Sequence, residues 1–336
     1  MRRIMFFRPM LYMGGTEIAI LNLIKNLNKS NYDIYIGYSD NESDKNLLEE
    51  YGKYATVMNV KENDIKVDVL INCSPYISAI KEFSRVEYEK IYLWFHHFGK
   101  SGISIFEDVE HIKKLDKIVV VSEATKKIML ENSYGELIKD KIDVIYNVLN
   151  VNEIIEKSKE IEEIQLSKGL NIVTICRLSL DKGFYRNLAL AECFKRRGLD
   201  FKWYIVGSSY YPEIEFEIKN MFKEYEDHFV FVGPKQNPFG ILKQCDYLTL
   251  LSDDETWGLV ITEAKILGIP CIVTDFNVAY EQIEDMKNGI ILSRTELNVY
   301  DERIEEIIKN KESFKEALKD FSYNIETIVN SWEKIL

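Results

Sequence analysis

Two glutamates separated by seven residues carry the clearest chemical signal in this chain of 336 residues. Glu255 follows an apolar run, Tyr247–Leu251, and Glu263 lies in a segment with helical periodicity, Gly258–Leu267. The pattern places carboxylates beside the start of a helix, where ligands that carry phosphates bind well. On a straight helix the two residues would lie ~12 Å apart along the axis. One carboxylate can then reach a sugar and the other a ribose diol, whereas simple exposure to solvent is the ordinary alternative for each.

Two cations follow a predicted strand, Asn171–Cys176, in the second half of the chain. Arg177 and Lys182 share one loop, and Gly183 permits an unusual backbone angle next to the lysine. Two cations at a strand end suit a diphosphate, especially one that gains charge as it leaves. The alternative is a solvated loop in which Asp181 pairs with a neighbour.

Glycines and histidines follow strands in the first half of the chain. Gly14 and Gly15 come after the first predicted strand and open a helix, where a backbone without side chains lets an anion approach. An ordinary turn with Thr16 as the helix N-cap is the alternative. The spacing is not GxGxxG, so a nicotinamide dinucleotide site is not supported. His96 and His97 end another strand, and adjacent histidines on a strand point to opposite faces and chelate a metal poorly.

The acidic run that precedes the second glutamate does not indicate a metal. Asp253, Asp254 and Glu255 are consecutive and lack the alternating Asp-x-Asp spacing of many metal-dependent sugar transferases. We therefore expect no metal site and no cofactor.

Composition limits the class of protein. The chain is 46% hydrophobic and 29% charged, which excludes disordered and fibrous classes. Its net charge is −12, with 20 basic and 22 acidic residues in positions 1–150 against 23 and 33 in the remainder. A nucleic-acid binder normally has the opposite sign.

The five cysteines are scattered and have no CxxC spacing, which favours a reduced cytoplasmic protein. The apolar start of the chain is interrupted by Arg8 and Pro9, so we interpret it as a strand and not as a signal peptide. No run approaches the ~18 apolar residues of a membrane span.

Short β-rich runs alternate with helix-period segments along almost the whole chain. The predicted strands of the first half are Ile4–Phe7, Asp33–Tyr38, Val67–Asn72, Lys90–Phe95, Lys117–Val121 and Ile142–Tyr146. Those of the second half are Asn171–Cys176, Phe201–Val206, Phe229–Val232, Tyr247–Leu251, Pro270–Thr274 and Gly289–Leu292.

Two such alternations predict an α/β protein with two doubly wound, Rossmann-like parallel-sheet domains. We expect an N-terminal domain at 1–150, a linker at 151–168 and a C-terminal domain at 169–320. The final helix, 321–336, can pack back on the N-terminal domain. Ligands of such sheets bind at the carboxyl ends of the strands, so the residues named above should cluster there.

Taken together, these segments resemble the retaining GT-B glycosyltransferases of family 4, the glycosyl transferases group 1. The matching pieces are GGTE at 14–17, a histidine at 96 or 97, VVVSEATKK at 119–127, VIYNVLN at 144–150, CRLSLDKG at 176–183, YIVGSS at 204–209, FVGPKQNP at 231–238 and the Glu255–Glu263 segment. Each is weak alone, but their joint order and spacing is specific. The resemblance implies two domains that face each other across a cleft.

The resemblance also implies roles for individual residues of the second domain. Arg177 and Lys182 would hold the donor diphosphate and stabilise it as the leaving group, and Glu263 would bind the ribose. The donor sugar and its phosphate would contact Glu255 and the backbone of Trp257, Gly258 and Leu259.

Three further roles follow from the same resemblance. Gly14 and Gly15 would approach the diphosphate from the first domain, and His97 or His96 would face the donor sugar and the acceptor. Lys235 would border the nucleobase. The chain departs from the family because Thr256-Trp257-Gly258 stands after the first glutamate where the family commonly has Gly-Phe-Gly, and we expect the bulkier Trp257 to reshape the sugar pocket.

The implied activity is a metal-independent, hexosyltransferase-type transfer from a nucleoside-diphosphate sugar to a hydroxyl acceptor, with retention. A UDP-sugar is favoured over a GDP-sugar. The acceptor would be a glycan, a lipid-linked molecule or a protein, in bacterial surface polysaccharide or glycoconjugate synthesis. Contact with the inner face of the plasma membrane stays open. The alternatives are a non-catalytic partner that binds sugar nucleotides, or a GT-B-shaped epimerase or phosphorylase.

Overall fold

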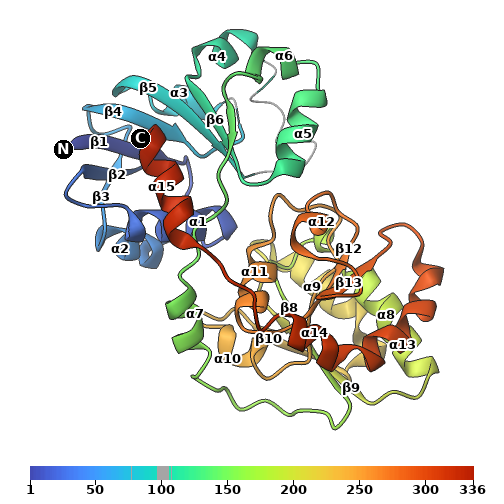
Figure 1. The fold of residues 1–336 in the computed structure, drawn as a ribbon. Coiled ribbons are helices and arrows are strands. Elements are labelled where there is room, and N and C mark those ends of the chain that lie inside the picture. The colour runs from blue at the N-terminus through green and yellow to red at the C-terminus, as the bar shows by residue number, and fades with distance from the viewer. Residues whose placement is uncertain (77, 97–105, 107) are drawn as a thin grey trace. The chain divides into compact units, whose positions relative to one another are not determined.

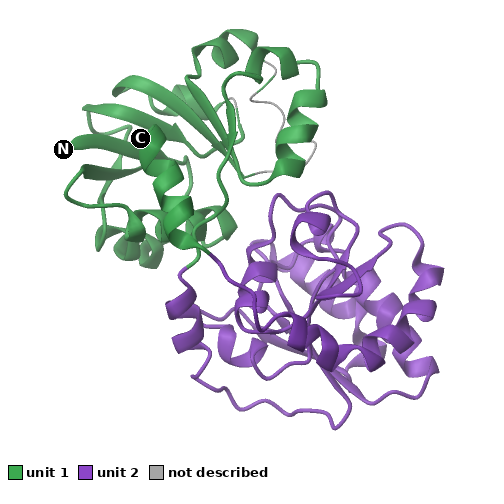
Figure 2. Ribbon diagram, in the orientation of Figure 1, with its two compact units in different colours: residues 1–149, 324–336 green, residues 150–323 purple. Residues whose placement is uncertain are grey.

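The computed structural model describes residues 1–76, 78–96, 106 and 108–336, and these form two compact units (Figures 1 and 2). Unit 1 comprises residues 1–149 and 324–336, and unit 2 comprises residues 150–323. Each unit is built around one parallel sheet with its own hydrophobic core.

The sheet of unit 1 has seven strands in the order β3-β2-β1-β4-β5-β6-β7. They are β1 (Arg2–Phe7), β2 (Tyr32–Tyr38), β3 (Thr56–Asn59), β4 (Ile65–Asn72), β5 (Val86–Phe95), β6 (Lys117–Val120) and β7 (Ile142–Val144). Every neighbouring pair is parallel, and the strand order reverses between β1 and β4. The central strands are apolar runs buried on both faces, as is typical of a parallel sheet.

Helices connect these strands. They are α1 (Gly15–Asn26), α2 (Lys45–Gly52), α3 (Ala79–Glu82), α4 (Val109–Lys114), α5 (Glu123–Glu131), α6 (Gly135–Ile138) and, from the end of the chain, α15 (Ile325–Ile335).

The C-terminal helix α15 belongs to unit 1 although the rest of the second half lies in unit 2 (Figure 2). Its Trp332 is fully buried and meets Trp94 of β5 at 4.6 Å between ring centroids. The backbone carbonyl of Ile335 accepts a hydrogen bond of 2.7 Å from the hydroxyl of Tyr92. An aromatic contact and a hydrogen bond therefore hold the end of the chain on the first sheet.

The sheet of unit 2 has six strands in the order β10-β9-β8-β11-β12-β13, and every neighbouring pair is parallel. They are β8 (Leu170–Ile175), β9 (Phe201–Val206), β10 (Phe229–Gly233), β11 (Tyr247–Leu250), β12 (Cys271–Thr274) and β13 (Gly289–Leu292). The order reverses between β8 and β11, which is the point where doubly wound sheets bind ligands.

The helices of unit 2 are α7 (Val151–Lys157), α8 (Phe184–Arg196), α9 (Pro212–Met221), α10 (Phe239–Leu242), α11 (Leu259–Ile266), α12 (Ala279–Gln282), α13 (Tyr300–Lys309) and α14 (Lys311–Ala317). Three short 3₁₀ turns accompany them at Leu180–Lys182, Lys223–Tyr225 and Leu297–Val299.

The structure confirms the prediction of two doubly wound parallel sheets and changes three details. All twelve predicted strands are present, eleven of them within about two residues; β5 begins four residues earlier than predicted, and the edge strand β3 was not predicted. The stretch expected to be a separate linker, 151–168, belongs to unit 2. It is held there because the side-chain amides of Asn237 and Gln244 donate to the carbonyls of Lys157 and Glu162. Within the final stretch, residues 321–323 belong to unit 2 and only 324–336 to unit 1.

None of the helices in the described part of the chain combines the length and the apolar character needed to cross a membrane.

The burial of α15 gives a testable expectation for stability. We expect Trp332→Ala to lower the free energy of unfolding by about 3–5 kcal/mol, because it leaves a large cavity against Trp94. Phe216→Ala is the matched control, since that side chain is 69% exposed. Denaturant unfolding measures both variants, and equal small losses would contradict the packing of α15 described above.

Candidate functional site

Two loops leave the sheet of unit 2 side by side where the strand order reverses. The first follows β8 and carries Arg177 and Lys182, and the second follows β11 and carries Glu255. Because β8 and β11 are paired neighbours, their carboxyl ends open at the same edge of the sheet. The predicted cations and the first predicted carboxylate therefore share one location.

A close backbone approach joins the two loops. Gly183 has φ +65° and ψ 37°, and a Cβ atom at this position would lie 2.0 Å from the carbonyl oxygen of Leu251. The amide of Asp253 donates to the carbonyl of Asp181 at 2.8 Å. Only glycine fits this conformation and this distance, so the sequence signal at Gly183 has a physical cause.

The approach brings Lys182 against Glu255. The Lys182 Nζ lies 2.8 Å from the Glu255 Oε1 and 3.4 Å from a carboxylate oxygen of Asp181. Both side chains of the close pair are largely buried, with 16% and 14% exposed. The hydroxyl of Ser252 donates to the same Glu255 oxygen at 2.8 Å. A charged ammonium thus lies at the edge of the sheet with its position fixed by carboxylates.

Lys182 is positively charged although its side chain is largely buried. Burial by itself would lower the pKa of the ammonium, but the summed attraction of Glu255 and Asp181 is larger and raises that pKa above its ordinary value. Lys182 therefore stays a cation at neutral pH, as the binding of a phosphate requires.

Arg177 lies in the same loop and is exposed. Its guanidinium carbon is 5.6 Å from the centre of the Tyr210 ring, which follows β9. No ion pair to Arg177 occurs among the described residues. A cation over an aromatic face is held by about 0.5–1 kcal/mol at an exposed site. The Tyr210 ring therefore orients the guanidinium of Arg177, which can still bind an anion.

Glu255 and Glu263 do not lie on one helix. Helix α11 begins at Leu259, after Gly258 with φ +72°, so Glu255 lies in the preceding loop and the straight-helix spacing does not apply. Glu263 is partly buried, and burial raises the pKa of its carboxyl to about 7. Its carboxylate has no hydrogen bond or ion pair within the described ranges. Such a group suits a ligand hydroxyl.

The side chain of Trp257 turns into the unit and away from solvent. It is 7% exposed, and its indole N–H donates to the hydroxyl of Thr262 at 3.0 Å. Thr262 in turn donates to Gln282, whose amide donates to the Trp257 carbonyl. The expectation that the bulk of Trp257 reshapes a sugar pocket is not supported, because the indole is buried. Trp257, Gly258 and Leu259 can offer a ligand the backbone N–H groups at the start of α11.

Lys235 lies apart from this group. It follows β10, the outermost strand, and its ammonium is 2.6 Å from a carboxylate oxygen of Glu162. No contact between described residues links it to Lys182 or Glu255, so the predicted role at the nucleobase stays a prediction.

In unit 1 the helix α1 begins at Gly15 with Gly14 as its N-cap, as the glycine pair predicted. Gly14 is extended, with φ −162°, and Thr16 is not the cap. The missed feature is Glu17, which is 3% exposed and lies 2.5 Å from the Nε of Arg8. A buried glutamate one turn into a helix needs such a partner.

The structure describes only one of the two predicted histidines, His96. Burial lowers the pKa of His96 to about 3, with a smaller contribution from the positive charge of Arg8. Its ring lies 4.4 Å from that of Trp94, and His96 is a neutral, half-buried side chain at neutral pH. His97, the preferred candidate, lies outside the described residues.

No group of three or more His, Cys, Asp or Glu side chains able to hold a metal ion occurs in the part of the chain that the structure describes. Sequence reasoning missed Ser252 as a partner of Glu255. It considered the pairing of Asp181 with a neighbour only for a solvated loop, whereas Asp181 lies 3.4 Å from Lys182 where the two loops meet.

Comparison with known proteins identifies the family of the chain and agrees with its fold. Residues 155–327, more than half of the chain, match the family model described as "Glycosyl transferases group 1". An N-acetyl-alpha-D-glucosaminyl L-malate synthase of Bacillus anthracis is 25% identical over 67% of this chain and 60% of its own length. An O-antigen biosynthesis glycosyltransferase, WclY of Escherichia coli, is 23% identical over 81% of this chain and 80% of its own length.

Among solved structures, HepE of Anabaena in complex with UDP and glucose superposes with a TM-score of 0.76. The two chains are 17% identical, and the match covers 100% of this chain and 99% of HepE. This likeness shows the fold, which is GT-B with two parallel-sheet α/β domains.

The contact between Gly183 and Leu251 can be tested with a matched pair of glycines. Gly198 has φ +66° and open space around its Cβ position, so Gly198→Ala adds only backbone strain of about 1–2 kcal/mol. Gly183→Ala adds the clash with the Leu251 carbonyl, and we expect a clearly larger loss of unfolding free energy in denaturant titrations. Equal losses for the two variants would mean that the loops do not depend on the close approach.

The raised pKa of Glu263 predicts a pH dependence of stability. In the folded chain the Glu263 carboxyl keeps its proton up to about pH 7, whereas in the unfolded chain it loses the proton near the ordinary pKa of 4.5. Between these pH values the folded state therefore binds more protons than the unfolded state. The contribution to stability is therefore present below pH 4.5 and is lost as pH rises through about 7. In Glu263→Gln we expect a smaller loss of stability between pH 5 and 8, measured by denaturant unfolding. The exposed Glu217→Gln should keep the wild-type slope, and an unchanged slope in Glu263→Gln would refute the assignment.

Proposed function

The chain belongs to the family of glycosyl transferases group 1, and on that premise we propose that it is a retaining, metal-independent transferase of family 4. Its donor would be a nucleoside-diphosphate sugar, with a UDP-sugar favoured, and its acceptor a hydroxyl of a glycan or glycoconjugate. The HepE complex holds UDP and glucose, and WclY acts in O-antigen biosynthesis, which supports this substrate class.

The observation that carries the proposal is the Lys182–Glu255 pair at the strand-order reversal of unit 2, with Arg177 in the same loop. Diphosphate binding would require a cation held in place before the ligand arrives, because fixed charge needs no reorganisation during the reaction. The ion pair supplies such a cation.

In the proposed reaction, the bond between the anomeric carbon and the β-phosphate oxygen breaks while the acceptor oxygen bonds to that carbon on the same face. The acceptor proton passes to the departing phosphate, and the nucleoside diphosphate leaves. Lys182 and Arg177 would neutralise the charge that develops on this phosphate, in the place of a metal ion. Glu255 would position the sugar, and Glu263 would accept a hydrogen bond from the ribose.

A screen of donors tests the proposal directly. Thermal-shift measurements with UDP-, GDP- and ADP-sugars identify a donor because a ligand that binds only the folded state raises its stability. Release of the nucleoside diphosphate, with and without a hydroxyl acceptor, then reports turnover. Binding without any release or transfer would favour a non-catalytic partner, and absence of binding to every donor would refute the proposal.

We expect Lys182→Ala to lower kcat/KM about 10²–10³-fold, since one fixed donor at a developing charge is worth about 3–4 kcal/mol. Glu263→Ala should also reduce transfer, chiefly through KM. Lys311→Ala is the matched control, because Lys311 pairs with Asp246 at 2.9 Å in the same unit but outside the site. Wild-type rates for Lys182→Ala and Glu263→Ala would show that the site assignment is wrong.

A further inference from the structure

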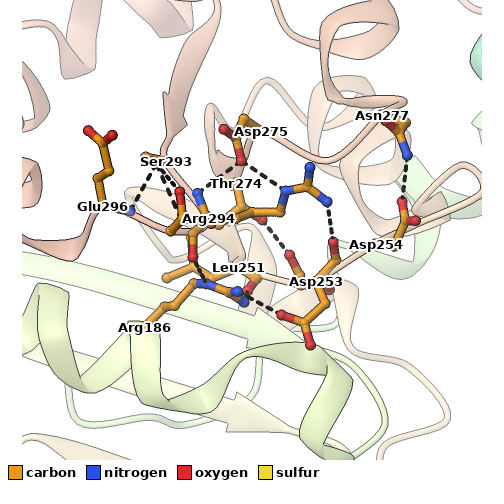
Figure 3. Close-up of polar contacts among 12 residues, drawn as sticks. Arg186, Leu251, Asp253, Asp254, Thr274, Asp275, Asn277, Ser293, Arg294 and Glu296 are labelled. Atoms are coloured by element: carbon orange, nitrogen blue, oxygen red, sulfur yellow. Dashed lines mark hydrogen bonds and ion pairs between the residues drawn. The ribbon is translucent and has the colours of Figure 1, made fainter.

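A network of four charged side chains supports the loop that carries Glu255, and no part of the proposed reaction uses it (Figure 3). Arg186 comes from α8, and the other members follow three successive strands: Asp253 after β11, Asp275 after β12 and Arg294 after β13. Two positive charges meet two negative charges, so the network is neutral as a whole.

Arg186 of α8 contacts the beginning of the loop. It is 4% exposed, and its guanidinium donates to the carbonyl of Leu251 at 2.9 Å and to the carboxylate of Asp253 at 2.6 Å. Its Nε also donates to the backbone carbonyl of Arg294 at 3.0 Å. A guanidinium buried to this degree is stable only when such partners are in place.

Arg294 holds the same loop from the opposite side (Figure 3). Its guanidinium donates to the carbonyl of Asp253 at 2.7 Å. Asp275 fixes the direction of the arginine, since one carboxylate oxygen accepts from the Arg294 Nε at 3.0 Å and from its backbone N–H at 2.9 Å. The two arginines together satisfy three acceptors of Leu251 and Asp253.

These contacts bear on Glu255 through the chain itself. Asp253 precedes Glu255 by two residues. The carbonyl of Ser252, the residue before Asp253, accepts from the Thr274 hydroxyl at 2.6 Å. Ser252 then donates to the Glu255 carboxylate. A shift of Asp253 would therefore move Glu255 relative to Lys182, and a displacement of about 1 Å in a positioning group can cost a large factor in rate.

We propose that Arg294, oriented by Asp275, is a positioning residue that fixes the loop from Leu251 to Gly258 so that Glu255 meets the donor. Arg294 acts through Asp253 and is assigned no contact with substrate. The inference rests on the proposed function of Glu255, but the rigidity of the loop can be measured without any substrate.

The first test is hydrogen–deuterium exchange of the full chain at the amides of residues 252–258. We expect Arg294→Ala to raise exchange there about tenfold, because it removes charge-assisted hydrogen bonds from the loop. Arg303→Ala is the control, because Arg303 pairs with Asp285 at 2.8 Å in a similar ion pair. The side chains of Arg303 and Asp285 are 24% and 38% exposed, and those of Arg294 and Asp275 are 31% and 34% exposed. Asp275→Asn provides a second, milder variant, with a smaller rise. Unchanged exchange in both Arg294→Ala and Asp275→Asn would overturn the inference.

The second test is a double-mutant cycle on transfer. Arg294→Ala should lower kcat/KM about tenfold in the wild-type background and less than about twofold in Glu255→Gln, because residues that act as a unit are not additive. Full additivity would overturn the inference and leave the proposed function intact. Wild-type activity of Glu255→Gln would instead refute the proposed site, and the exchange result would still decide the rigidity of the loop.

Discussion

The contact between Gly183 and the carbonyl oxygen of Leu251 decides where Lys182 lies. A side chain at Gly183 would overlap that oxygen, so the loop after β8 can approach the end of β11 only with glycine at this position. Once the loops are joined, the lysine ammonium and the Glu255 carboxylate meet at 2.8 Å with little freedom to separate. The charge at the edge of the second sheet is therefore a consequence of backbone geometry.

The carboxyl ends of the two sheets differ in the charge that they offer. In unit 1 the charges of Arg8 and Glu17 satisfy each other, and His96 is neutral because its pKa is about 3. In unit 2, Arg177 is exposed, and Lys182 stays protonated because its pKa is raised. Among the described residues at these strand ends, the cations suited to a diphosphate thus come from unit 2.

The features of the structure that depend on local residue patterns could be predicted from the sequence alone. Buried parallel strands are short apolar runs, and for this reason twelve of the thirteen were predicted. The missed strand, Thr56–Asn59, lies at the sheet edge, where a four-residue strand needs no strong apolar signal. The loop glycine at Gly183 was found because glycine there has a steric cause.

What depends on contacts between distant loops could not be predicted. The burial of Trp257 follows from Thr262 and Gln282, and a departure from a motif does not reveal where an indole points. Arg294 and Asp275 are ordinary charged residues in sequence, and they reach the Glu255 loop only because β12 pairs with β11 and β13 pairs with β12. Long-range polar contacts leave no periodic signature, which is why these residues emerged from the structure alone.

The most direct measurement is a calorimetric comparison of UMP with UDP, or of the matching pair for the nucleoside that the chain prefers. If Lys182 and Arg177 bind the distal phosphate, UDP should bind at least about tenfold more tightly than UMP, as expected for a charge-assisted contact. In Lys182→Ala most of that difference should disappear while UMP affinity changes little. Equal affinities of UMP and UDP for the wild-type chain would contradict the account of the site.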